Sequence, residues 1–423
     1  MREDFLHYIW KHKKFLMLNL KTESGESLSV VSLGEHNLNS GPDFFNSQLL
    51  IGNQLWAGNV EIHVKSSDWF LHNHENDKAY DNVILHVVWE HDTEVFRKDN
   101  TVIPILQLKS YISESVFNKY KQLFNSKDRW INCENDFASI DGFLLNNWLE
   151  RLYFERLEEK SNLIEQLLET SKNDWEAVLF KMLSKTFGLK VNGDAFLSLA
   201  QSLDFSVVRK TQSTQKTLEA LLFGQTGLLN DDIQNSYFLN LKKDYQFLKQ
   251  KFNLENAQVL QLQFFRLRPN NFPTIRLSQL SNLYHKHQNL FSKLIESKSL
   301  NEFYELFKVE TSEFWENHYT FQKESKKSKK VLSKSFIDLL LINTIIPVKF
   351  SYAIHQGKSI NDDILELIAK IKSEKNSIID SFNNLKPISK SALQSQSLIQ
   401  LKNHYCDKNK CLQCVVGNTL LGK

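Results

Sequence analysis

The hydrophobic pattern of this chain changes its period near Cys133, and this change constrains the fold more than any other feature. Before it, residues 44–51 and 56–65 are rich in strand-forming side chains and are separated by a Gly-Asn pair, which predicts a β-hairpin. After it, apolar residues recur at helical spacing. We therefore expect an α+β protein, with an α/β module containing a mixed sheet over residues 1–132 and a larger, mainly helical domain over residues 133–423.

The expected elements follow from the same periodicity. In the module we expect helices and strands at these positions: helix 3–15, strands 28–33, 44–51, 56–65, 83–90 and 102–108, and helix 111–124. In the second domain we expect helices over residues 140–170, 174–188, 194–203, 213–223, 236–252, 277–296, 336–344, 362–373 and 391–404. Only 13 Gly and 6 Pro favour such long regular elements over linkers.

Composition argues against several classes of protein. A net charge of +3 creates no global field that demands an anionic membrane or nucleic acid. No uninterrupted apolar run reaches the roughly 18–20 residues of a membrane span, and the N-terminus lacks the regions of a signal peptide. Four cysteines do not make a secreted disulfide framework, and no phosphate-binding loop, dinucleotide fingerprint or Gly-x-Ser-x-Gly elbow is found. We expect a soluble, cytoplasmic protein without membrane partner or nucleotide cofactor.

The chemistry-bearing residues gather between Asp43 and His86. Because alternate residues of a strand share a face, Glu61, His63 and Lys65 line one side of the strand over residues 56–65. Asp43 opens the partner strand of the same hairpin, so we expect all four side chains to converge. The two carboxylates suit Mg²⁺ or Mn²⁺, and His63 and Lys65 can orient water or neutralise a phosphate.

A second group of polar side chains follows the hairpin, and six of the 13 histidines fall between His36 and His91. The candidates for a supporting or alternative metal site are Asp68, His72, His74, Asp77 and His86. Nitrogen ligands favour Zn²⁺ or Mn²⁺ over Mg²⁺, which makes a zinc hydrolase the alternative enzyme. The structural alternative is that His86 is a hydrogen-bonded core residue and that His72 and His74 are exposed to solvent.

Two resemblances follow from these motifs. Pro42-Asp43, a hairpin and Glu61-x-His63 resemble the Pro-Asp…(Asp/Glu)-x-Lys signature of the restriction-endonuclease-like superfamily, with histidine in place of its lysine. That resemblance implies a restriction-endonuclease-like module and metal-dependent cleavage of DNA or RNA. The whole chain also resembles an uncharacterised bacterial family known as a domain of unknown function, through 41-GPDF-44, 60-VEIH-63, 67-SDW-69, 219-EALLFG-224, 268-RPNNFP-273 and the terminal cysteines.

An arginine-rich turn interrupts the helical domain. Two prolines within five residues enforce an extended turn, and Arg266, Arg268 and Arg276 project from it or lie beside it. Guanidinium groups match phosphate geometry, so these arginines are candidates for binding nucleic acid. The alternative, which we favour, is a rigid elbow whose arginines cap helix ends or pair with Glu219, a carboxylate that needs a partner if its helix is buried.

The cysteines form the last candidate site. Cys406, Cys411 and Cys414 cluster near the C-terminus, and Cys133 is the only other cysteine. The short Cys-x₂-Cys spacing allows two thiolates to reach one ion, and four thiolates suit Zn²⁺ or an iron–sulfur cluster. In the alternative, Cys133 is an ordinary buried thiol and the other three bind zinc with His404, or bind nothing.

The sequence as a whole favours a metal-dependent nuclease. Nucleic acid is the partner that this function implies, with Mg²⁺ or Mn²⁺ in the N-terminal site and Zn²⁺ or an iron–sulfur cluster at the cysteines. A zinc-dependent hydrolase, or a non-catalytic scaffold that binds nucleic acid or protein, remains the alternative.

Overall fold

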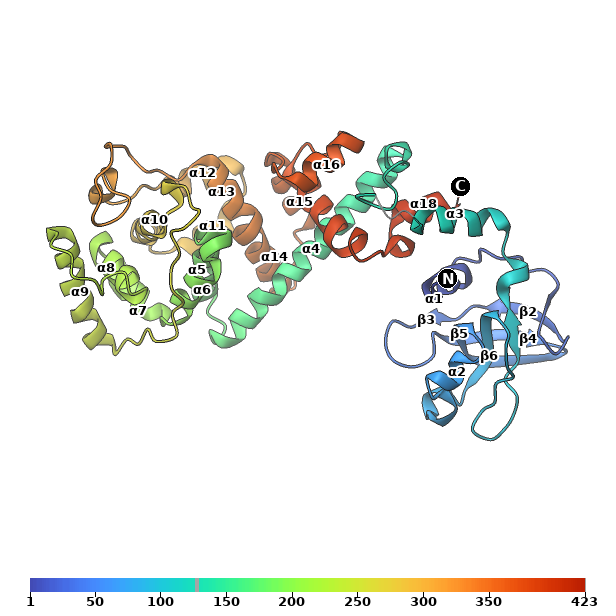
Figure 1. Ribbon diagram of the computed structural model, residues 1–423. Helices are drawn as coiled ribbons and strands as arrows, with labels where there is room; N and C mark the ends of the chain where they lie inside the picture. The colour runs from blue at the N-terminus through green and yellow to red at the C-terminus, as the bar shows by residue number, and fades with distance from the viewer. Residues whose placement is uncertain (126–128, 423) are drawn as a thin grey trace. The chain divides into compact units, whose positions relative to one another are not determined.

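The structure, a computed structural model, describes residues 1–125 and 129–422 (Figure 1). Its contacts divide the chain into two compact units. The first contains Met1–Trp148 together with the segment that begins at Leu401, and the second contains Leu149–Gln400. The sheet lies in the first unit and helices dominate the second, so the expected α+β class with an N-terminal mixed sheet is confirmed. The contacts draw the division differently from a boundary after residue 132, because the C-terminal segment returns to the first unit.

A seven-stranded mixed sheet forms the centre of the first unit. Its strands are β1 (Leu20–Lys21), β2 (Ser27–Ser32), β3 (Glu35–His36), β4 (Phe44–Ile51), β5 (Gln54–Lys65), β6 (Val83–Glu90) and β7 (Ile105–Gln107). Their order in the sheet is β1-β2-β4-β5-β6-β7, and β3 pairs with β4. The pairs β2–β4 and β4–β5 are antiparallel, whereas β5–β6 and β6–β7 are parallel. Strand β5 is therefore where the antiparallel and parallel halves meet.

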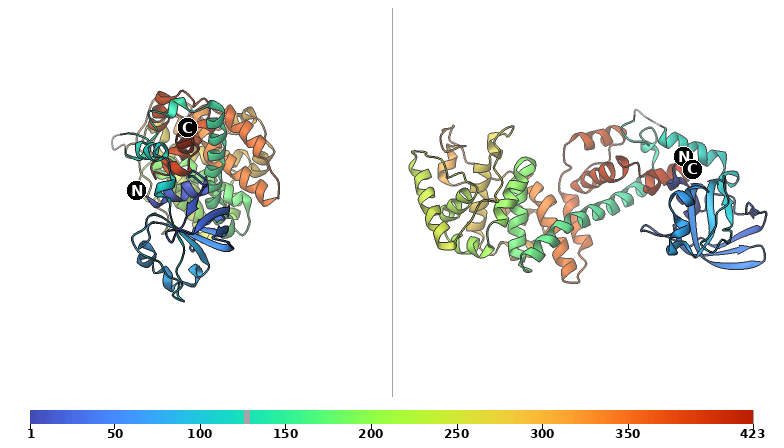
Figure 2. Two further views of the ribbon diagram at one scale, coloured as in Figure 1. Left: turned by 90° about the vertical axis from the view of Figure 1, so that its right-hand side faces the viewer. Right: turned by 60° about the horizontal axis from the view of Figure 1, so that its bottom comes forward.

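Helices flank this sheet. Helix α1 (Glu3–Lys11) packs against β5 and buries Phe5, Leu6 and Ile9 completely. The parallel pairing of β5 and β6 requires a crossover, which contains α2 (Asp68–Leu71) and two short 3₁₀ helices, His74–Asn76 and Lys78–Tyr80. Helix α3 (Glu114–Phe124) lies beside the C-terminal helix α18 (Val415–Gly422), as Figure 2 shows. The crossover thus carries polar side chains back over β5.

The second unit consists of helices around one hydrophobic cluster, which extends from Tyr153 to Leu393. Its helices, the first of which begins in the first unit, are α4 (Gly142–Thr170), α5 (Trp175–Phe187), α6 (Leu189–Gln201), α7 (Phe205–Thr211), α8 (Gln215–Gln225), α9 (Ser236–Phe252), α10 (Pro273–Lys286), α11 (Leu290–Glu296), α12 (Leu300–Leu306), α13 (Lys334–Leu340), α14 (Ile346–His355), α15 (Asn361–Lys370), α16 (Ser377–Leu385) and α17 (Ala392–Gln400). The helix expected over 277–296 is two helices, because the backbone leaves the helical region at His287.

The most apolar helical stretch of the described chain is Lys334–His355, which combines α13, a π-helical turn and α14. By length and composition alone it could cross a membrane, although charged and polar residues interrupt its apolar run. Its most apolar window is 67% buried inside the protein. Burial among the other helices of the second unit accounts for its composition, as in the core helix of a soluble protein.

The buried carboxylate of Glu219 accepts hydrogen bonds from hydroxyl groups and not from an arginine. The hydroxyl of Tyr237 in α9 donates to it at 2.6 Å, and Ser278 in α10 donates to its other oxygen. The proposed pairing of Glu219 with an arginine of the elbow is therefore corrected, since these hydroxyls occupy both oxygens. Burial raises the pKa of Glu219 to about 7, and the hydrogen bonds from Ser278, Tyr237 and Ser312 only partly oppose it.

We expect the stability of the second unit to fall as the pH rises from about 4.5 to about 7, since folded Glu219 keeps its proton in this window while the unfolded chain loses it. The shift corresponds to a contribution on the order of 3 kcal/mol. A Glu219→Gln variant, which is neutral at every pH, should lack this part of the slope. Urea unfolding at pH 5, 6, 7 and 8 measures it, and parallel pH profiles for the two proteins would contradict the assignment.

Candidate metal centre

Two carboxylates meet at the start of the β4–β5 hairpin. Asp43 lies directly before β4, and Glu61 lies in β5, where Phe44 pairs with Val60. The backbone N–H of Asp43 donates to Glu61 Oε2 at 3.1 Å, and the backbone N–H of Ile62 donates to Asp43 Oδ2 at 2.9 Å. Each carboxylate therefore accepts a backbone N–H at or next to the residue that carries the other, and the expected convergence of Asp43 and Glu61 is observed.

Three histidines complete the group around Glu61. His63 follows on the same face of β5, and the crossover supplies His72 and His74 on either side of Asn73, whose positive φ of 57° turns the chain. The Nε2 atom of His63 lies 3.1 Å from Nδ1 of His72 and 3.5 Å from Oε1 of Glu61. The Nε2 atom of His74 lies 3.3 Å from the same carboxylate oxygen. The ligand atoms of the three histidines all lie within 4.8 Å of one another, which is close enough to share one metal ion.

Burial sets the charge of this group. It raises the pKa of Glu61 to about 9, and the charge of Asp43 adds to the increase. It lowers the pKa of His63 to about 3, and the neighbouring His74 and His72 lower it further. Neutral imidazole is the form that binds a metal, so burial holds His63 in its ligating state. A divalent cation would stabilise the carboxylate that burial alone disfavours.

His86 lies behind the group, on the adjacent strand β6. Its Nε2 atom is 2.9 Å from Nδ1 of His63, and its side chain is fully buried. This contact fixes the ring of His63 with Nε2 toward Glu61 and His72, which is the role that outer hydrogen bonds play at metal sites. Tyr80 stacks on His74 with ring centroids 3.7 Å apart, so this aromatic side chain packs against the site.

The profile of one protein family, described as a protein of unknown function (DUF2851), matches residues 3–377. The chain belongs to this family. The DUF2851 match covers the sheet, the crossover with its histidines and most of the helical unit, which confirms the resemblance expected from the sequence. No curated protein and no solved structure matches the chain.

Three candidates of this DUF2851 protein lie outside the group. Lys65 is half exposed at the end of β5, and its amine lies 4.0 Å from Asp92. The expected placement of Lys65 beside the carboxylates is corrected, because the strand ends at this residue and its amine lies beside Asp92 instead. Asp68 accepts the backbone N–H of Lys65, and Asp77 accepts that of Ala79. Both aspartates therefore shape turns of the crossover.

His7 is a further member of the site that the sequence pattern did not predict. It lies on α1, and its Nε2 atom is 3.2 Å from Oδ2 of Asp43, while Glu3 lies one helical turn before it at 3.8 Å. Burial lowers the pKa of His7, but the hydrogen bond and charge of Asp43, with the charge of Glu3, raise it by more. The only signal was a Glu-x₃-His spacing on the predicted helix, which places both side chains on one face.

The three candidate arginines of the elbow divide into two kinds. Arg276 is buried in α10, donates to Asn271 and Gln279, and stacks over the ring of Phe336. Arg276 is therefore no longer a candidate for binding a phosphate, because these contacts use its guanidinium within the elbow, as the favoured interpretation expected. Arg266 and Arg268 are exposed and stay candidates for binding nucleic acid.

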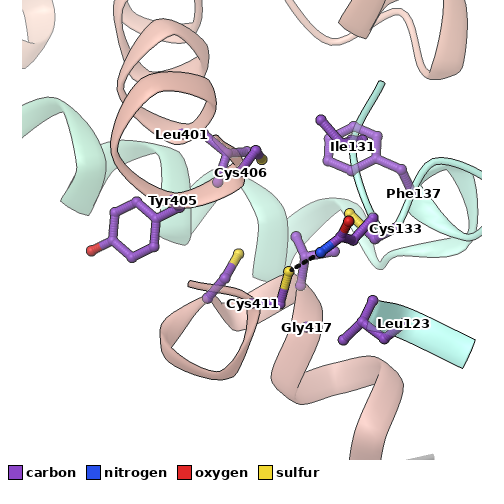
Figure 3. A pocket seen from close by; sticks show the side chains of 12 residues that line it. Leu123, Ile131, Cys133, Phe137, Leu401, Tyr405, Cys406, Cys411 and Gly417 are labelled. Atoms are coloured by element: carbon purple, nitrogen blue, oxygen red, sulfur yellow. Dashed lines mark hydrogen bonds between the residues drawn. The ribbon is translucent and has the colours of Figure 1, made fainter. Parts of the chain in front are cut away.

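The four cysteines are free thiols, and all of them line one cavity of the first unit (Figure 3). Cys133 precedes a 3₁₀ helix at residues 137–139, Cys406 ends a π-helical turn that begins at Leu401, and Cys411 and Cys414 flank the turn before α18. The last three lie beyond residue 377, where the DUF2851 match ends.

Proposed function

We propose that this protein is a metal-dependent phosphodiesterase that cleaves nucleic acid at the group around Glu61. The observation that carries the proposal is the convergence of the Glu61 carboxylate with His63, His72 and His74 beside Asp43. The mixed oxygen and nitrogen ligands favour Mn²⁺ or Zn²⁺, whereas the two carboxylates alone would also suit Mg²⁺. His72 is exposed, so the group is open to substrate from solvent.

The chain's own residues have separate tasks in this proposal. Glu61 and the three histidines would hold the ion, which would polarise the phosphodiester and lower the pKa of a bound water. Asp43 can accept a proton from an attacking water, since one of its oxygens faces His7 and its backbone is fixed by Glu61. His7 can donate a hydrogen bond to a phosphate oxygen. The restriction-endonuclease-like signature gives such a role to its lysine, and the sequence had suggested Lys65 or His63 for it.

The topology supports this proposal. Helix α1, the antiparallel strands β2, β4 and β5, a crossover and the parallel strand β6 follow one another. This order fits a restriction-endonuclease-like core, which consists of a helix, three strands, a connecting segment and a fourth strand. The departure is the histidine-rich crossover, which adds His72 and His74 to a site that otherwise rests on two carboxylates.

The three histidines favour a zinc-dependent hydrolase of another substrate class as the second candidate function, because three imidazoles within reach of one ion are a common ligand set of catalytic Zn²⁺. A non-catalytic scaffold is the third and would need no ion. Four free thiols suit a reducing compartment, so we propose the cytoplasm as the location and nucleic acid as the partner.

Metal binding and cleavage test the proposal together. We expect calorimetry to detect tight binding of Mn²⁺ or Zn²⁺, and we expect cleavage of single- or double-stranded DNA or RNA only in the presence of the ion. His72→Ala should weaken binding by roughly 10- to 100-fold without unfolding the exposed crossover. The matched control is His12, an exposed histidine directly after the last residue of α1. His12→Ala should change neither metal binding nor cleavage.

Each outcome has a defined meaning. Binding that His72→Ala weakens, without cleavage of any nucleic acid, would favour a hydrolase of another substrate class. No binding of Mn²⁺ or Zn²⁺ by the wild-type protein would contradict both enzymatic candidates and leave the scaffold.

A further inference from the structure

A second site lies away from the histidines, at the other end of the sequence. Cys133 and Cys406, Cys411 and Cys414 are separated by more than 270 residues in the chain, yet all four line one cavity of about 10 Å³. Figure 3 shows Cys133, Cys406 and Cys411 around the same space, contributed by separate segments. All four cysteines of this 423-residue chain thus lie around one small cavity, which points to a common function of their sulfur atoms.

The surroundings of the cavity are those of a closed metal site. Cys133 and Cys414 are buried, and apolar side chains form much of the wall, among them Leu123, Ile131 and Phe137. The amide Nδ2 of Asn132 donates to Cys411 Sγ at 3.4 Å. Such N–H donors to sulfur and an apolar shell orient thiolates and exclude water around metal centres.

Burial raises the pKa of all four thiols, that of Cys414 to about 11, and the neighbouring sulfurs add to the increase for Cys133 and Cys406. Four sulfurs that face one small cavity make few hydrogen bonds there, whereas a soft cation in the same place would bind all four as thiolates.

We propose that Cys133, Cys406, Cys411 and Cys414 are the four thiolate ligands of one structural metal centre. The centre joins the segment after α3 to the C-terminal segment, and the turn Cys411–Gln413 in turn packs against α1, which carries His7. It is independent of the proposed catalysis, because none of its ligands belongs to the group around Glu61.

Four thiolates can bind either a zinc ion or an iron–sulfur cluster, and one observation favours each of them. A cavity of about 10 Å³ suits a single ion. Among the described residues, however, no three of the four sulfurs lie within 4.8 Å of one another, whereas a single zinc ion needs sulfurs about 3.8 Å apart. An iron–sulfur cluster binds its thiolates on separate iron atoms and accepts wider spacing. Zn²⁺ and the cluster are therefore the two arms of the experiment.

The experiment is metal analysis of the full-length chain purified without oxygen and without added metal. The background is Glu61→Gln with His63→Ala, so that ions at the histidine group do not contribute. We expect either one zinc per chain, with no colour, or iron with acid-labile sulfide and visible absorption. Either result supports the four-thiolate centre, and a chain with neither metal overturns it.

Variants then test the ligand set. Cys133→Ser and Cys411→Ser should each lower the metal content by several-fold and release the C-terminal segment to limited proteolysis. His404→Ala is the matched control, since His404 does not line the cavity and should leave the metal content unchanged. Unchanged metal in Cys133→Ser, or loss of metal in His404→Ala, would overturn the four-cysteine assignment. A thiol titration of wild type before and after chelation keeps the test valid if a variant does not fold.

Discussion

Glu61→Gln is expected to lower the rate of metal-dependent phosphodiester cleavage by at least roughly 10³-fold, because loss of a charged ligand removes several kcal/mol of transition-state stabilisation. Glutamine keeps the volume of the side chain and an oxygen that can accept the N–H of Asp43, which Glu61 now accepts at 3.1 Å. The fold should therefore survive. The measurement is kcat as a function of Mn²⁺ concentration, with the melting temperature recorded in the absence of metal.

Lys65 provides the control on the same strand and the same face. Its side chain is half exposed and its amine lies beside Asp92, so Lys65→Gln should change the rate by less than about twofold. If Glu61→Gln retains wild-type activity, the cleavage belongs to another site or a contaminant. If Lys65→Gln removes activity instead, the lysine of the restriction-endonuclease-like signature acts in solution and the assignment of roles must be reversed.

Gly224→Ala should destabilise the second unit by about 2–3 kcal/mol, although alanine is the better helix former. An added Cβ would lie 2.0 Å from Cγ of Tyr245, whose ring packs against α8 from α9. The ring cannot retreat easily, because it is nearly buried and its hydroxyl donates to Gln225 at 3.1 Å. Denaturant unfolding followed by circular dichroism measures the loss.

The matched control is Gly142, at the start of α4, where an added Cβ meets nothing within 4 Å. Gly142→Ala should be neutral or slightly stabilising, since it gains helix propensity without a collision. Equal effects of the two substitutions would show that propensity, and not the approach of α8 to α9, decides the stability at Gly224.

The sequence predicted local features of the fold well. Strands β4, β5 and β6 and the long α4 lie close to where the sequence placed them, because an apolar pattern that continues over eight or more residues leaves little choice. The helix α8 was expected over residues 213–223 and instead spans Gln215–Gln225, so that Gly224 lies inside it. Glycine there serves the contact with Tyr245, which depends on tertiary packing that a local pattern cannot reveal.

The candidate site was predicted in part for the same reason. Strand alternation correctly placed Glu61 and His63 together, and pairing within the hairpin brought Asp43 beside them. Alternation also placed Lys65 in the site, but the strand ends at that residue and its side chain is exposed to solvent. His7 was missed because its contact with Asp43 joins elements that are 36 residues apart and that pair only through the packing of α1 on β5.

The first unit consists of two segments of the chain, one before the second unit and one after it. This order has a consequence for biosynthesis. Between Trp148 and Leu401 a ribosome adds the entire helical unit, which takes roughly 10–50 s at usual elongation rates. Throughout that interval the surface of α3 that α18 later contacts stays uncovered. The three cysteines that share a cavity with Cys133 have not yet been synthesised. The nascent sheet unit is thus completed last, and a chain whose translation stops early exposes an unfinished surface to the chaperones and proteases that recognise one.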